Sequence, residues 1–105
     1  LIGKNSTVTS AQLKSSFIRI PSNFNNLIQI VCSYFDDNSS SMSFDIMSLD
    51  GSGNIATVQS ITHSANQLND TTNVNEDVDG KILYIDNVSG TTGGKGYGIT
   101  LKFNV

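Results

Sequence analysis

The segment Asn75–Asp86 has the residue types and spacing of a calcium-binding loop. Its ligands would be Asn75, Asp77, Asp79 and Asp86. Gly80 stands where such a loop turns sharply, and hard cations prefer carboxylate and amide oxygens. However, the first ligand is Asn instead of Asp, the last is Asp instead of Glu, and Lys81–Ile85 has the pattern of a strand. The sequence leaves both interpretations open; we favour a turn before a strand and assign no metal ligand.

The glycine-rich segment Gly90–Gly96 resembles a phosphate-binding loop. Three residues, instead of four, precede its Gly-Lys pair, and Gly96 stands where a hydroxyl residue would bind magnesium. A strand pattern follows where the motif requires a helix. We therefore expect a loop between strands and no nucleotide cofactor.

The sequence also lacks the marks of nucleophilic catalysis. Cys32 lies in the apolar run Leu27–Phe35, which predicts a buried small hydrophobic residue, and a single cysteine cannot form an internal disulfide. His63 is the only histidine, and no Gly-x-Ser-x-Gly motif is present. We expect that the protein is not an enzyme and has no cofactor.

The composition argues against nucleic-acid-binding and membrane-spanning proteins. The 105 residues have a formal net charge of -3, and only 14% are charged. The six basic residues are scattered, so we expect no nucleic-acid partner. No apolar stretch is long enough to cross a membrane. The chain begins at Leu1 without a signal-peptide pattern, which suggests a fragment of a longer chain or a processed product.

Alternation of apolar and polar residues predicts strands along most of the chain. The expected strands are Phe17–Ile20, Leu27–Phe35, Met42–Leu49, Ile55–Thr62, Lys81–Val88 and Tyr97–Val105. We predict two antiparallel hairpins, one from the third and fourth of these strands and one from the last two. The strand Leu27–Phe35 is apolar on both faces, as in the centre of a sheet, and residues 63–79 read as a long polar surface connection.

These features predict a single all-β domain over residues 1–105. Short strands, short turns and one long crossover are typical of an antiparallel Greek-key β-sandwich or jelly-roll with six or more short strands.

The neutral polar composition suits a saccharide ligand, which Asn, Asp, Ser and backbone groups hold against an aromatic ring. Tyr97 is the candidate ring because it stands beside the glycine-rich loop at the mouth of a strand. The remaining candidate ligand-binding residues, from that loop and from residues 63–79, are Lys95, His63, Asn66, Asn69 and Asp70.

Low charge, abundant Asn, Ser, Thr and Gly, short strands and a chain that ends on a regular strand look like the distal head domains of phage tail receptor-binding proteins and tail fibres. The resemblance implies a homotrimer on the virion, at the tail tip or surface and thus extracellular. It also implies a non-catalytic adhesion head that recognises saccharide on the bacterial cell surface.

The alternative is a structural or decoration module of a virion or surface assembly that packs against copies of itself. Its basis is the apolar residues of Leu27–Phe35 and of Ile55–Ile61, which exceed what one small sandwich needs to bury.

Overall fold

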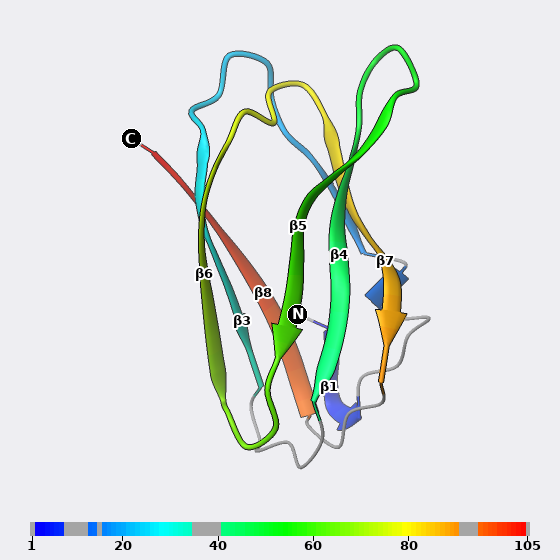
Figure 1. The fold of residues 1–105 in the computed structure, drawn as a ribbon, viewed down its shortest axis with the longest axis vertical. Helices are drawn as coiled ribbons and strands as arrows, with labels where there is room; N and C mark the ends of the chain where they lie inside the picture. Colours follow the sequence, from blue (N-terminus) through cyan, green and yellow to red (C-terminus); the bar gives the residue numbers. More distant parts are fainter. Residues whose placement is uncertain (1, 8–12, 15, 35–40, 91–94, 105) are drawn as a thin grey trace.

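The computed structural model of the chain describes residues 2–7, 13–14, 16–34, 41–90 and 95–104, with the backbone alone for residues 2–7 and Lys95. The strands are β1 (Ile2–Thr7), β2 (Phe17–Arg19), β3 (Leu27–Ser33), β4 (Met42–Leu49), β5 (Ile55–His63), β6 (Asn69–Glu76), β7 (Ile82–Ser89) and β8 (Lys95–Phe103) (Figure 1). Within these residues only Leu13 and Lys14 are helical, and no helix is long and apolar enough to cross a membrane.

The strands form two antiparallel sheets around one core. The first sheet has the order β1-β8-β3-β6 and the second has the order β2-β7-β4-β5. The pairs are nested: β4 pairs with β5, β3 with β6, β2 with β7 and β1 with β8. The chain is therefore a long antiparallel ribbon that folds back at the β4–β5 turn and wraps into two layers (Figure 1). This architecture confirms the predicted all-β sandwich.

The core is built from the inward-facing residues of both sheets. Burial alternates strictly along β4, because successive side chains of a strand point to opposite faces. Residues from each layer meet in one apolar cluster, whose buried members are Leu13, Ile20, Leu27, Ile30, Cys32, Tyr34, Met42, Phe44, Ile46, Ile61, Val78, Leu83, Ile85 and Tyr97. Full burial of one such side chain contributes about 1.5–3 kcal/mol.

Two predicted features of the sheets are confirmed. β4 and β5 form the expected hairpin, and its turn is held by the Asp50 carboxylate, which accepts hydrogen bonds from the backbone N–H groups of Ser52 and Asn54, both at 2.9 Å. β3 is a central strand, because it lies between β8 and β6 in the first sheet.

The interpretation of residues 63–79 as a surface connection is wrong. Asn69–Glu76 forms β6, which pairs with β3 at the edge of the first sheet. Its side chains are exposed or half-buried, so the strand needs almost no apolar residue, and its backbone hydrogen bonds hold it in place. Only Val74 of this strand packs against the core.

The predicted C-terminal hairpin is also wrong. β7 pairs with β4 and β2, whereas β8 pairs with β3 and β1, so the two strands lie in different sheets. The connection between them is long enough for the chain to cross from one layer to the other. A tight two-residue turn would have forced direct pairing.

Three connections gather at one end of the sandwich, namely those between β2 and β3, β4 and β5, and β6 and β7 (Figure 1). There the backbone N–H of Gly80 donates to the carbonyl of Pro21 at 3.2 Å. The connection between β5 and β6 lies at the opposite end, where Gly90 approaches the backbone of Ser41.

Candidate functional site

Tyr97 and His63 do not lie on the surface. Both side chains are fully buried in the core, with 0% exposure. Tyr97 belongs to the inward-facing set of β8, and His63 is the last inward-facing residue of β5. The prediction that Tyr97 offers a flat ring to a ligand is therefore corrected, as is the placement of His63 in a solvated segment.

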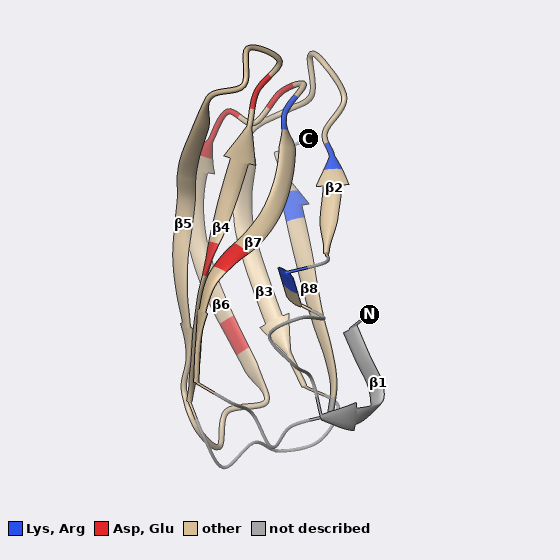
Figure 2. Ribbon diagram, turned by 90° about the vertical axis from the view of Figure 1, so that its right-hand side faces the viewer, with Lys and Arg blue, Asp and Glu red and all other residues tan. Residues whose placement is uncertain are grey.

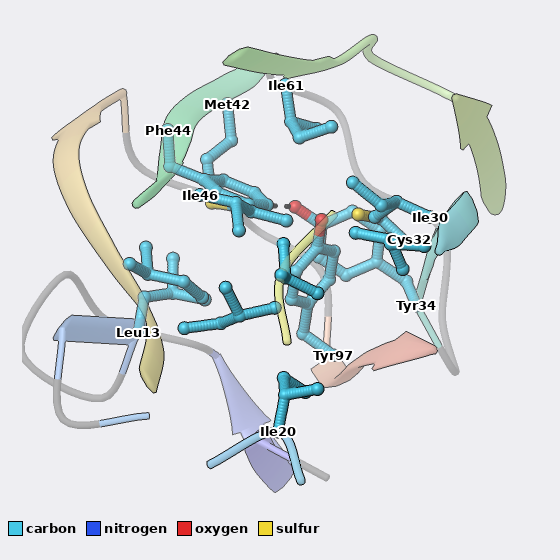
Figure 3. Close-up of a cluster of buried hydrophobic side chains, with 14 residues drawn as sticks. Leu13, Ile20, Ile30, Cys32, Tyr34, Met42, Phe44, Ile46, Ile61 and Tyr97 are labelled. Carbon is cyan, nitrogen blue, oxygen red and sulfur yellow. Dashed lines mark hydrogen bonds between the residues drawn. The ribbon is translucent and has the colours of Figure 1, made fainter. Parts of the chain in front are cut away.

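Tyr97 and His63 instead form a buried aromatic and polar cluster with Tyr34 and Cys32. The ring centroids of Tyr34 and Tyr97 are 4.5 Å apart, and those of Tyr34 and His63 are 4.7 Å apart. Figure 3 shows the Tyr34, Cys32 and Tyr97 side chains directed into the core beneath Ile61. Tilted ring pairs at these separations stabilise a core beyond the area that they bury.

A chain of hydrogen bonds runs through this cluster. The Nε2 atom of His63 contacts the backbone carbonyl of Gln67, its Nδ1 atom lies 3.3 Å from the Tyr97 hydroxyl, and that hydroxyl is hydrogen bonded to the Cys32 thiol. A carbonyl only accepts, so Nε2 carries a proton. In neutral His63 the Nδ1 atom then accepts from the Tyr97 hydroxyl, which in turn accepts from the thiol.

Burial keeps the thiol and the phenol of this cluster protonated. Desolvation raises the pKa of Cys32 to about 11, and the hydrogen bond that the Tyr97 hydroxyl can donate to the thiolate form offsets this rise only in part. Desolvation likewise raises the pKa of Tyr97 above its ordinary value. At neutral pH Cys32 is thus a thiol, and a thiolate nucleophile is not present at this position.

The other candidate ligand-binding residues occupy the β5–β6 end of the molecule. Asn66 is exposed in the turn with a φ of 58°, and Asn69 is exposed at the start of β6. Asp70 is half-buried on the same strand. The Lys95 side chain and residues 91–94 of the glycine-rich loop lie outside the described residues. The structure thus brings Asn66, Asn69 and Asp70 to one end, where they are exposed or half-buried, whereas the nearby rings of Tyr97 and His63 are enclosed in the core.

The calcium-like pattern is divided between different elements. The Asp77 carboxylate accepts the backbone N–H of Asp79 at 3.1 Å in a turn. Asp86 lies within β7, where its carboxylate is 3.9 Å from the Lys14 ammonium. In the described part of the chain, no three His, Cys, Asp or Glu side chains are placed to hold a metal ion.

One opening in the described structure has mostly apolar walls, and we call it the edge cavity. It has a volume of about 680 Å³ and lies between the two sheets on the side of β2 and β8. Its lining residues are Ser16, Phe17, Ile18, Ile46, Leu83, Tyr84, Ile85, Ile99, Thr100, Leu101 and Phe103. The edge cavity is open to solvent and is therefore a surface groove with mostly apolar walls, not an enclosed void.

The strand β2 leaves large apolar side chains in solvent beside the edge cavity. Ile18 pairs with Leu83 on the inner face but remains 50% exposed, and Phe17 pairs with Tyr84 on the outer face and is 73% exposed. Sequence reasoning assigned this strand without recognising it as a surface feature. The available signal was its lack of alternation, because Phe17 and Ile18 are adjacent and both apolar.

The apolar residues of Leu27–Phe35 and Ile55–Ile61, on which the structural alternative depends, differ in their exposure to solvent. Leu27 and Ile61 are buried and Val31 is half-buried, whereas Ile55 is 61% exposed near the tip of the β4–β5 hairpin. Phe35 lies outside the described residues. The exposed apolar surface of β2 is therefore not the one that the sequence indicated.

A comparison of the chain with protein-family models, curated proteins and solved structures found no match.

Proposed function

We propose that this protein is a non-catalytic assembly module of a virion or surface assembly and that its β2 side packs against protein. The observation that carries the proposal is the pairing of the edge cavity with exposed Phe17 and Ile18. Scattered single apolar residues are ordinary on a surface, but apolar side chains next to an open apolar cavity mark an interaction site.

The chemistry of the edge cavity favours protein over saccharide. Eight of its eleven lining residues are Ile, Leu or Phe, and the hydroxyl-bearing ones are Ser16, Tyr84 and Thr100. Saccharides require several amide, carboxylate and hydroxyl partners together with an accessible ring. The candidate ring of Tyr97 is enclosed in the core.

The fold supports a viral or surface setting. We propose that the nested strand pairing is that of an eight-stranded jelly-roll, a fold used by viral capsid and lectin domains. With the resemblance to phage tail head domains, this favours an extracellular location on the virion and a homotrimer.

Light scattering of the purified chain tests self-packing. We expect a native mass near three times 11.2 kDa, and a lower mass for Phe17→Ser. Ile55→Ser is the matched control, because Ile55 is similarly exposed but lies beside the β4–β5 turn. A monomer at every concentration, or equal effects of both substitutions, would contradict packing through β2.

A saccharide-binding head is the second candidate function, and it has one observation in its favour. The β5–β6 end exposes the neutral amides of Asn66 and Asn69 beside Asp70. Titration with purified bacterial cell-wall saccharides tests it: binding should be lost in Asn66→Ala and Asn69→Ala, and the absence of binding to the unaltered protein would exclude it.

A further inference from the structure

The strand β8 has an edge that is only partly paired. On one side β3 pairs with it from Gly98 to Phe103. On the other side the described pairing with β1 joins Ile2 to Tyr97 and Thr7 to Lys95. Within the described residues, no strand therefore pairs with residues 99–103 on the β1 side. An unpaired strand edge is a template for another extended segment.

This free edge borders the edge cavity. Ile99, Leu101 and Phe103 alternate along β8, pack against the core and line the cavity. A strand added beside them would point every second side chain between the two sheets, towards Ile18 and Leu83 on the opposite wall. Five residues of such a strand span about 17 Å, which is the length of a common strand.

The charges around the opening indicate which charged side chains a strand added beside β8 would have on its outer face. The basic residues whose side chains are described are Lys14, Arg19, Lys81 and Lys102. They lie immediately before β2, on β2, immediately before β7 and on β8 (Figure 2). Acidic residues lie on β4 and β6 and also on β7, where Asp86 is 3.9 Å from the Lys14 ammonium (Figure 2). Lys102 is the basic residue on β8 itself whose side chain is described. Opposite charges on paired strands attract, so acidic side chains are favoured next to Lys102.

We propose that an extended protein segment with alternating apolar and acidic side chains adds to β8 at residues 99–103, antiparallel to β8, and fills the edge cavity. The segment continues the line of β1, its backbone pairs with the free edge, and its apolar residues enter the gap beside Ile18. Peptide binding by strand addition combines backbone affinity with side-chain pockets in this way. The inference deepens the proposed function, on which it rests, by naming the chemistry of the partner.

The probe is a dye-labelled peptide of alternating valine and glutamate, titrated against the purified chain. We expect saturable binding by fluorescence anisotropy and slower amide hydrogen exchange at residues 99–103. A peptide of alternating serine and glutamate has the charge without the apolar residues and should not bind. Equal binding of the two peptides, or unchanged exchange at residues 99–103, would overturn the proposal.

A charge reversal tests the register without disturbing the core, because Lys102 is exposed. Lys102→Glu should weaken binding of the valine–glutamate peptide about fivefold and strengthen binding of a valine–lysine peptide by a similar factor. Glu76→Lys on the far edge strand β6 is the control and should change neither affinity. Equal effects of the two substitutions would show attraction by net charge alone and overturn strand addition at β8.

The outcome is separable from that of the light-scattering experiment. An oligomer that does not bind the peptide, together with a monomeric Phe17→Ser variant that does not bind it either, overturns strand addition and leaves self-packing intact. A monomer that binds the peptide at residues 99–103 supports strand addition and overturns self-packing. An apolar dye that occupies the cavity and is not displaced by the peptide identifies a small-molecule site and overturns strand addition.

Discussion

The Nδ1 atom of His63 lies 3.3 Å from the Tyr97 hydroxyl oxygen, although the two residues are 34 positions apart in the chain. His63 ends β5 in the second sheet and Tyr97 lies on β8 in the first, so this contact joins the two layers through the core. A buried polar contact of this kind is costly unless every partner is present. The cluster around Tyr97 is therefore a sensitive point of the fold.

Tyr97→Phe should destabilise the protein by about 1–3 kcal/mol, because it leaves the His63 ring and the Cys32 thiol without their shared buried partner. Urea unfolding followed by circular dichroism measures the change. Tyr84→Phe removes the same atom from a half-buried ring on the outer face, and we expect a change within about 0.5 kcal/mol. Similar losses for both variants would contradict a special role for the buried hydroxyl.

Stability should fall in alkaline solution. The pKa of Cys32 is raised from 9.0 to about 11 in the folded protein. Between these values the unfolded thiol ionises while the folded thiol does not, so its contribution is fully present below pH 9 and is lost as the pH rises to about 11. Between these pH values the free energy of unfolding should fall with a slope that approaches about 1.4 kcal/mol per pH unit. Urea titrations at several pH values should show a shallower decline for Cys32→Ala, in which the buried Tyr97 phenol still acts in the same direction.

The Cys32 thiol should be unreactive in the folded protein. Its side chain is buried and protonated at neutral pH, whereas reaction with a disulfide reagent requires an accessible thiolate. We expect the absorbance change with an aromatic disulfide to follow unfolding by urea. A rapid stoichiometric reaction in native buffer would contradict the burial.

Gly90→Ala should destabilise the protein more than Gly53→Ala. Both glycines have positive φ, 83° and 85° respectively, so both substitutions carry backbone strain. At Gly90 an added Cβ would also stand 2.8 Å from the backbone oxygen of Ser41, whereas it meets nothing within 4 Å at Gly53. We expect Gly90→Ala to lower the free energy of unfolding in urea by about 1 kcal/mol more than Gly53→Ala does. Equal losses would mean that the chain at Gly90 moves away from Ser41.

Ile18→Ala should cost much less stability than Ile85→Ala, although both residues line the edge cavity. Ile18 is half exposed and Ile85 is 6% exposed, so the first loses little buried area and the second leaves a void. We expect a loss below about 1 kcal/mol for Ile18 and of about 2–5 kcal/mol for Ile85. A large loss at Ile18 in thermal or urea unfolding would mean that its side chain is enclosed.

The hairpin of β4 and β5 shows why some of the fold was predictable. Its strands alternate, its turn is short, and the Asp50 carboxylate satisfies the turn backbone. The alternation is visible along each strand, and the hydrogen bonds of Asp50 join residues two and four positions apart. The central position of β3 was predictable for a similar reason, because residues apolar on both faces suit a strand with neighbours on each side.

β6 and the separation of β7 from β8 were not predictable from local pattern. β6 is stabilised by backbone pairing with β3, more than 35 residues earlier in the chain, and its own side chains are polar. For β7 and β8, the connection permits either a hairpin or a crossover, and the choice depends on the distant strands β4 and β3.

The sequence established the all-β class, the inward sets of several strands and the burial of Cys32, because these follow from alternation along the chain. Tertiary structure alone decided that Tyr97 and His63 meet inside the core, that Asp86 lies apart from Asp77, and that β2 and β8 border an open apolar gap. Those features depend on which strands become neighbours. Pairing between distant segments is set by the packing of the whole core, so no short stretch of sequence encodes it.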